Sequence, residues 1–184
     1  MKKTDLLEWK EAVPADELVK SCLSEHGTID ERCRGKLKRL VKEHHFLMLR
    51  TTFYRWNAKG SLFYQIRQKC QHQYEELSEG FDLLKIELKG KGITSDSQHR
   101  QYSAIYANIL SGNQRGNTEL VNDLMYNHQK MTELVARMLS EYSNTLGAHL
   151  TTLLRVRAEA HTTHYNEWKE LIEKYSSLIA KPSA

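Results

Sequence analysis

The sequence predicts an all-α protein in which four long amphipathic helices form one bundle. Three observations support this prediction: only two prolines and nine glycines occur among 184 residues, strong helix formers fill the stretches between them, and apolar residues recur at every third or fourth position. A chain of this length fits one ordinary domain, and its hydrophobic fraction of 40% is sufficient for a core.

The first long helix is expected to begin at a capping box, in which Thr28 bonds forward and Glu31 bonds back. A shorter helix between Pro14 and Gly27 precedes it as an appendage. The long helix continues to Asn57, before the Lys-Gly pair at 59–60. Its apolar stripe consists of Cys33, Leu37, Leu40, Val41, Leu47, Met48, Thr51 and Tyr54.

The second helix follows at once, with Gly60 ending the first helix and Ser61 as the expected N-cap of the next. A connection this short makes the two helices antiparallel neighbours. The sequence "KGKG" at 89–92 closes the second helix. Its stripe consists of Phe63, Ile66, Cys70, Tyr74, Leu77, Phe81, Leu84 and Leu88.

Residues 93–116 are predicted to form a long crossover that carries one short helix. A third helix is expected after Asn117 as N-cap, and Gly147 separates it from a fourth. The third stripe consists of Leu120, Leu124, His128, Met131, Val135, Met138 and Tyr142. The fourth consists of Leu150, Leu153, Leu154, His161, His164, Trp168, Leu171 and Tyr175.

Two hairpins joined by a long crossover have the connectivity of a ferritin-like four-helix bundle. The predicted organisation is an N-terminal extension with a short helix over 1–27, the bundle over 28–176, and a C-terminal tail over 177–184.

Charge and cysteine content narrow the class of protein. The formal net charge is +4, with nine further histidines, and in an assembly of many copies this field would favour contact with a polyanion. Three cysteines without CxxC or zinc-finger spacing indicate neither a disulfide framework nor a structural zinc site. The first residues do not resemble a secretory signal, and no apolar run of 18 residues could span a membrane, so we expect a cytoplasmic protein.

Three stretches resemble the Dps-type mini-ferritins, the DNA-binding proteins from starved cells. "RWNAKGSLF" is similar to the family's His-Trp pair, short glycine turn and aromatic start of the second helix, with Arg55 in place of the histidine. "DLMYNHQKMTELVARMLSEY" and "HLTTLLRVRAEAHTTHYNEWKELIE" resemble its third and fourth helices. The resemblance covers roughly 36–176 and implies a shell of many subunits, a dodecamer in this family, that binds DNA and stores iron.

The resemblance also implies where a ferroxidase site would lie. In the family, two histidines and an aspartate from one subunit meet an aspartate and a glutamate from its partner. The corresponding positions here are Arg55, Arg67 and Gln71, then Asp82 and Ile86. Because guanidinium groups offer no lone pair and repel a cation, we expect no catalytic residue, no metal and no resident cofactor at this place, although iron elsewhere is possible.

The altered residues suggest a structural use. We hypothesise that Arg55 or Arg67 of one subunit forms a charge-assisted pair with Asp82 of its partner, so that a salt bridge replaces a metal bridge. The alternative is that the arginines reach solvent.

Histidines at other positions are candidate metal ligands. No Glu-x-x-His occurs, and His161 and His164 share a helical face without a paired acid on that turn, so we interpret them as core or interface residues, with metal binding as the alternative. His44 and His45 are consecutive and point apart, one expected in packing and one in solvent.

Basic residues suggest contact with DNA phosphates, which needs no base readout. A solvated face is the alternative, because acids dilute the segment. The candidates are Lys2, Lys3, Lys10, Arg32, Arg34, Lys36, Lys38 and Arg39.

Three functions are compatible with the sequence. The first is a Dps-like shell that lacks the usual ferroxidase ligands and protects or compacts DNA, stores iron passively, or does both under stress. The second is an iron-oxidising mini-ferritin with a displaced metal site, and the third is a structural oligomer that binds a protein partner. Motifs of nucleotide-binding proteins and hydrolases are absent from the sequence, so an enzyme of those classes is not expected.

Overall fold

The computed structural model describes residues 29–94 and 116–179. These ranges contain helices and no strand: α3 (Glu31–Asn57), the 3-10 turn η1 (Gly60–Leu62), α4 (Phe63–Gly90), α6 (Asn117–Leu146) and α7 (Ala148–Ile179). The predicted helix that ends at Gly27 and the predicted short helix of the crossover lie outside the described residues.

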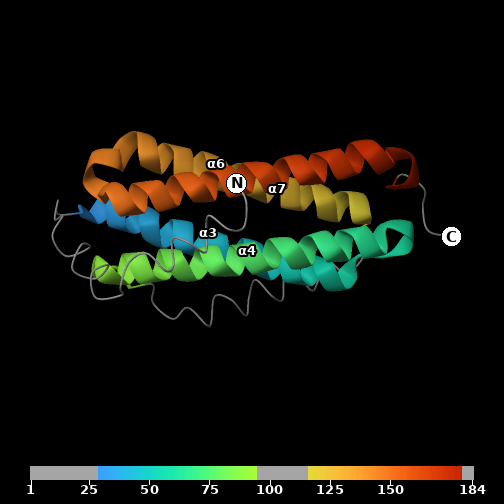
Figure 1. Ribbon diagram of the computed structural model, residues 1–184, viewed down its shortest axis with the longest axis horizontal. Helices are drawn as coiled ribbons and strands as arrows, with labels where there is room; N and C mark the ends of the chain where they lie inside the picture. Colours follow the sequence, from blue (N-terminus) through green and yellow to red (C-terminus); the bar gives the residue numbers. More distant parts are fainter. Residues whose placement is uncertain (1–28, 95–115, 180–184) are drawn as a thin grey trace, which may run out of the picture.

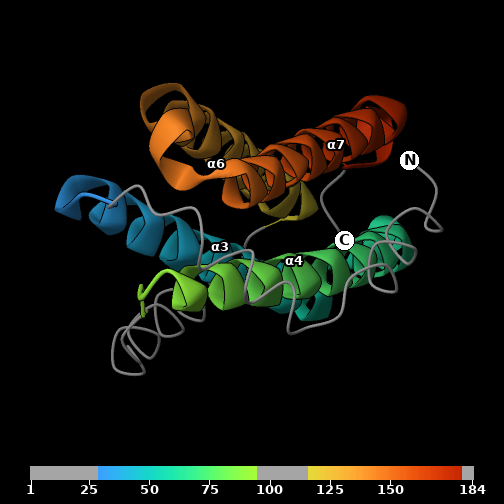
Figure 2. The ribbon, with the colours of Figure 1, turned by 60° about the vertical axis from the view of Figure 1, so that its left-hand side comes forward.

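The four helices form two hairpins that pack as two layers. Figures 1 and 2 show α3 beside α4 in one layer and α6 beside α7 in the other. Between the layers, α3 packs closely against α6, whereas α4 and α7 make a looser contact. This arrangement confirms the all-α four-helix bundle that the apolar stripes predict.

Both hairpins turn at a glycine in the left-handed region. Gly60 has a φ of 71° and Gly147 has a φ of 79°, and residues with a Cβ rarely adopt this backbone conformation. Asn117 ties the α3–α4 turn to the first turn of α6, because its Oδ1 accepts from the Lys59 backbone N at 3.1 Å and its Nδ2 donates to the Lys59 carbonyl.

The predicted helix starts were displaced by one or two residues. Asp30, and not the predicted box, caps α3, with its Oδ1 accepting from the Cys33 backbone N at 2.6 Å. Leu62 occupies the N-cap position of α4, since Ser61 lies within the 3-10 turn. Gly116 occupies that position in α6, so Asn117 is already helical.

The predicted stripes form the core, with a few exceptions. Phe63 was expected inside but is 36% exposed, because it lies at the outer start of α4. The polar side chains Gln73, Glu87 and Arg157 are buried where apolar periodicity gave no signal. Since every helix also carries a polar exposed face, none in the described ranges is long and apolar enough to cross a bilayer.

Candidate functional site

The α3–α4 hairpin brings together three of the five positions that correspond to a ferroxidase site, and all three are altered. Arg55 lies in the last turn of α3 and donates through Nη1 to Oε1 of Gln71 in α4. The guanidinium carbons of Arg55 and Arg67 lie 4.5 Å and 5.0 Å from the ring centroid of Trp56, so the two cations flank one indole. We name Arg55, Trp56, Arg67 and Gln71 the arginine cluster.

The other two positions lie far along α4 from the arginine cluster. Asp82 is fifteen residues beyond Arg67, a separation of about 22 Å at the rise of an α-helix. Both Asp82 and Ile86 are exposed, and Ile86 has 69% of its surface accessible. Within one chain, therefore, the carboxylate cannot meet the guanidinium groups.

The chemistry of the arginine cluster does not fit an iron site. A metal ligand must present a lone pair, and a guanidinium has none at any ordinary pH. The Gln71 oxygen already accepts from Arg55, and the two cations that flank Trp56 would repel a metal ion. No step of iron oxidation can be assigned to these residues.

The described DNA-binding candidates fall into two groups. Arg32, Lys38 and Arg39 are exposed near the start of α3. Arg34 and Lys36 are half-buried and engaged: Arg34 donates to the Gly92 carbonyl at 2.9 Å, and Lys36 pairs with Glu141. Arg39 also lies 3.9 Å from Glu43.

Acidic partners therefore reduce the basic character of this segment. Lys2, Lys3 and Lys10 lie outside the described residues.

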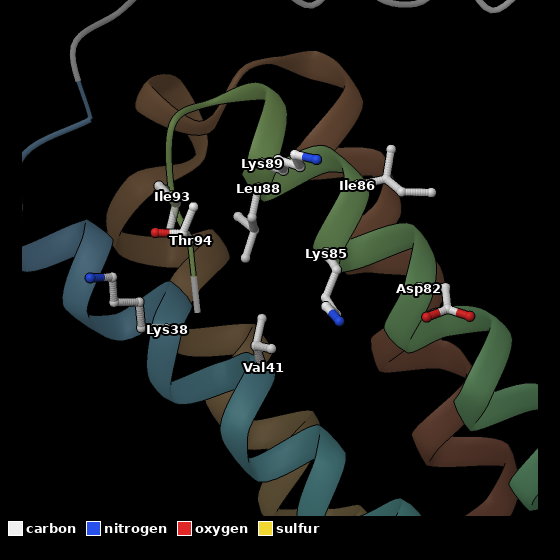
Figure 3. A pocket seen from close by; sticks show the side chains of 9 residues that line it. All are labelled: Lys38, Val41, Asp82, Lys85, Ile86, Leu88, Lys89, Ile93 and Thr94. Atoms are coloured by element: carbon white, nitrogen blue, oxygen red, sulfur yellow. The ribbon is translucent and has the colours of Figure 1, made fainter. Parts of the chain in front are cut away.

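A cavity of about 460 Å³ opens between α3 and α4 near the end of α4. Figure 3 shows Lys85 of α4 directed toward Val41 of α3, whereas Asp82 and Ile86, which also line the cavity, point away from α3. The cavity is also lined by Lys38, Leu88, Lys89, Ile93 and Thr94.

A histidine layer lies at the centre of the bundle and is the site that sequence reasoning undervalued. It consists of His44 from α3, His128 from α6, and His161 and His164 from α7, none more than 2% exposed. The Nδ1 atoms of His128 and His161 are 3.1 Å apart. The ring centroids of His128 and His164 are 5.1 Å apart, and those of His44 and His161 are 5.5 Å apart.

The consecutive histidines of α3, His44 and His45, match only in part the prediction that one packs in the core and the other reaches solvent. His44 is buried and its Nε2 lies 2.8 Å from the Leu77 carbonyl oxygen, which fixes Nε2 as the protonated nitrogen. His45 is half-buried, with its ring centroid 5.0 Å from that of Phe81. The packing role is therefore confirmed for His44, and His45 is less exposed than expected.

Burial determines the charge of three members of the histidine layer. It lowers the pKa of His44 to about 4, with a neighbouring Arg157 charge adding to the effect. Burial also holds the pKa of His128 and of His161 well below the usual range of histidine, and the nearby histidines act in the same direction. These three imidazoles are therefore neutral near pH 7.

His164 behaves differently because two carboxylates flank it. Its Nε2 lies 3.0 Å from Glu76 and its Nδ1 lies 3.7 Å from Glu167, at ion-pair distances without the alignment of a hydrogen bond. Burial alone would lower the pKa of His164, but Glu167 and Glu76 outweigh it and raise that pKa. In turn, His164 is the main cause that lowers the pKa of Glu167 to about 2.

Polar groups continue from the histidine layer toward the far end of α7. Trp168 donates through Nε1 to Oε1 of Gln73 at 2.7 Å, and Gln73 Nε2 lies 3.3 Å from Glu167. Lys69 lies 3.3 Å from the same carboxylate. An amide within an apolar stripe carries no periodic signal, which is why Gln73 was not predicted.

No three or more His, Cys, Asp and Glu side chains within 29–94 and 116–179 converge as a formed metal site. Five buried ring nitrogens of the histidine layer nevertheless have no hydrogen-bond partner: His44 Nδ1, His128 Nε2, His161 Nε2 and both nitrogens of His164, which lie only at ion-pair distance from carboxylates.

Comparison with known proteins supports the fold. The chain is similar to the crystal structure of a Dps protein from Vibrio cholerae O1, described as a member of a broad superfamily of ferritin-like diiron-carboxylate proteins. The TM-score is 0.53 over 85% of this chain and 99% of that chain. The fold is a ferritin-like four-helix bundle.

The similarity to the Vibrio cholerae protein is structural and hardly extends to the sequence. Only 12% of residues are identical between this chain and the Vibrio cholerae protein. No protein-family model and no curated protein matches the sequence. The likeness therefore establishes the fold, and function has to be argued from the residues of this chain.

Proposed function

We propose that this chain is a Dps-like, shell-forming protein of the cytoplasm that has lost the interfacial ferroxidase ligands, protects or compacts DNA under stress, and stores iron passively if at all. In this proposal the homo-oligomer is a dodecamer. One observation supports the proposal: the exposed residues of α4 follow an order in which apolar meets apolar and cation meets anion when the helix is aligned with an antiparallel copy of itself.

The α4 face consists of two rows of residues spaced four apart, one toward each end of the helix, which meet at the consecutive residues Tyr74 and Glu75. Its members are Phe63, Arg67, Gln71, Tyr74, Glu75, Ser78, Asp82 and Ile86. All are exposed or half-buried, including the apolar Phe63 and Ile86. Phe63 and Ile86 lie at opposite ends of this face, so they do not form one apolar patch, and complementarity depends on the order of residues along the face.

A two-fold axis between Tyr74 and Glu75 would pair this face with itself. Two antiparallel copies of α4 would then oppose Phe63 to Ile86 and Arg67 to Asp82 of the second copy. Apolar groups thus meet apolar groups and a cation meets an anion at both symmetry-related ends. Contact along this whole length requires the near-antiparallel crossing of about 20°, in which rows of residues three and four apart interdigitate.

In this pairing the arginine cluster stabilises the dimer, and no iron is needed. The stacking on Trp56 holds the Arg67 guanidinium near the surface, where a partner carboxylate could accept from it. A charge-assisted contact at two symmetric positions would hold the dimer that a shared metal otherwise bridges. The dimer is the first step toward a closed shell.

The proposed binding of DNA depends on the assembly, because each chain carries only a modest net charge that many copies would multiply. One chain carries +4, and the exposed Arg32, Lys38 and Arg39 add no more than a local patch. Twelve copies would present that patch twelve times to one polyanion, and such binding weakens steeply with salt. Lys2, Lys3 and Lys10 are proposed to add further phosphate contacts.

The mass of the native assembly tests the proposal first. A dodecamer of the 21.5 kDa chain has a mass of about 260 kDa, and light scattering after gel filtration distinguishes it from smaller species. A monomer or dimer at all concentrations would remove both storage and DNA compaction. Mobility shift of plasmid DNA across a salt series then separates a DNA-binding shell from an oligomer that binds a protein partner.

The alternative of an iron-oxidising mini-ferritin has one specific observation in its favour, the buried histidine layer. Anaerobic addition of Fe²⁺ followed by oxygen or peroxide tests it. Fast oxidation with a fixed number of iron ions per chain would favour the enzyme. Slow oxidation at the rate of free iron in buffer agrees with the passive shell.

A further inference from the structure

The histidine layer places four imidazoles together in an interior that is otherwise largely apolar. His44, His128, His161 and His164 come from three different helices and are at most 2% exposed. Burying polar groups costs free energy unless each finds a partner. Four such residues at one level of the bundle therefore call for a reason beyond packing.

The partners of these rings are incomplete. His44 Nδ1, His128 Nε2, His161 Nε2 and both nitrogens of His164 are buried and make no hydrogen bond. The unpaired Nε2 atoms of His128 and His161 are distinct from the Nδ1 atoms that face each other. Because most buried side-chain polar atoms in native proteins have a partner, this unpaired set marks the histidine layer as a place where a ligand or an ion would bind. The rings around them are the best candidates to hold it.

The contact between His128 and His161 has the spacing of two ligands of one ion. Their Nδ1 atoms are 3.1 Å apart, and only one proton can lie between them. Imidazole nitrogens bind zinc at about 2.0–2.1 Å, so two adjacent ligands of one ion lie about 3.0–3.4 Å apart. The pair is therefore already near the geometry of one edge of a coordination shell.

The protonation of His128 and His161 suits a metal ion. At His164, in contrast, Glu167 and Glu76 raise the pKa despite burial, so an ion has to displace the proton of that third ring. Metal ligation needs a neutral imidazole, and protons normally compete for the lone pair. His128 and His161 are neutral near pH 7 because burial lowers the pKa of each. A carboxylate next to a ligating histidine commonly orients the ring, and Glu76 lies 3.0 Å from His164 Nε2.

We propose that His128 and His161 anchor one divalent transition-metal ion at the centre of the bundle, with His164 as the third ligand. Since the described residues hold no formed group of three ligands, the His164 ring turns toward the pair when the ion binds. A site built from three imidazoles suits Zn²⁺, Co²⁺, Ni²⁺ and Cu²⁺. This site is separate from the arginine cluster and does not depend on the proposed shell.

Titration with Co²⁺ tests the site, because its visible absorption reports the ligands and their geometry. The full chain, without a histidine tag, is first treated with a chelator and dialysed. We expect one Co²⁺ per chain, displaced by Zn²⁺, with affinity reduced at least about tenfold in His161→Gln and in His128→Gln. His72→Gln is the matched control, since His72 is an exposed histidine of α4, and it should bind as the native protein does.

Two kinds of result would overturn the site. The first is the absence of stoichiometric Co²⁺ binding by the native chain, or binding that survives both core substitutions or is lost equally in His72→Gln. The second holds even if the core variants fail to fold: X-ray absorption of the Co²⁺-loaded native protein that shows fewer than two imidazole ligands. Two or three imidazoles in that spectrum would support the site.

Discussion

The guanidinium of Arg157 in α7 fills the space beside Gly80 in α4. A Cβ added at Gly80 would lie 2.1 Å from Arg157 Nη1, and the same nitrogen donates to the Glu76 carbonyl at 3.3 Å. Arg157 is only 7% exposed. The missing side chain at Gly80 therefore lets a charged group cross between the two hairpins, where α4 and α7 otherwise meet loosely.

Gly80→Ala should destabilise the bundle because the buried Arg157 side chain would have to move away from Glu76. Overpacking of this kind costs about 1–3 kcal/mol, more than the roughly 0.5–1 kcal/mol that alanine gains over glycine within a helix. Urea unfolding followed by circular dichroism measures the difference. Gly35→Ala is the matched control in α3: nothing lies within 4 Å of its added Cβ, so that variant should be more stable than the native chain.

The hydrogen bond between Trp168 and Gln73 should appear as coupling in a double-mutant cycle. Gln73→Leu leaves the buried indole N–H without its acceptor, at a cost of about 1–3 kcal/mol. Trp168→Phe removes the donor, so the combined variant should lose less stability than the sum of the two single changes. Additive losses would show that the 2.7 Å contact contributes nothing of its own.

Stability should decline at alkaline pH partly because of Cys70. Burial raises the pKa of this thiol from about 9 to about 12, so above pH 9 the unfolded chain loses a proton that the folded chain keeps. The contribution is therefore present below pH 9 and is lost as pH rises toward 12. Between pH 8 and 10, the free energy of unfolding should fall by about 1 kcal/mol less in Cys70→Ala than in the native chain. Equal declines would contradict a shifted Cys70.

Binding to DNA should depend on the two exposed residues Arg32 and Lys38 more than on charge in general. Replacing both with alanine should weaken binding to all sequences alike and reduce the slope of log affinity against log salt by about one for each lost phosphate contact. The control variant replaces Arg137 and Lys169, also exposed, by alanine, with the same change in charge. If both double variants bind equally, the start of α3 is not the DNA-binding surface.

The sequence predicted the helices well because each helix buries one face and repeats its apolar residues with the period of the helix. The buried stripe of α6, from Leu120 to Tyr142, was predicted almost in full. Helix starts were less accurate, since Asp30 and Thr28 are both good caps and only the path of the backbone decides between them.

The interior polar contacts could not be predicted in the same way. Whether His128 meets His161, or Gln73 meets Trp168, depends on the register of two helices that are far apart in sequence. One-dimensional periodicity contains no information on that register. Gly80 gave no signal either, because its role is defined by Arg157 from another hairpin.

An exchange of charges between Arg67 and Asp82 tests the central claim, that the α4 face pairs with its own copy, most directly. Arg67→Asp and Asp82→Arg should each place like charges opposite one another twice in the dimer, and light scattering should show a shift toward the 21.5 kDa chain. The variant with both changes restores opposite charges and should recover the assembly of the native protein. Single variants that assemble normally, or a combined variant that stays as dissociated as the single ones, would contradict the account.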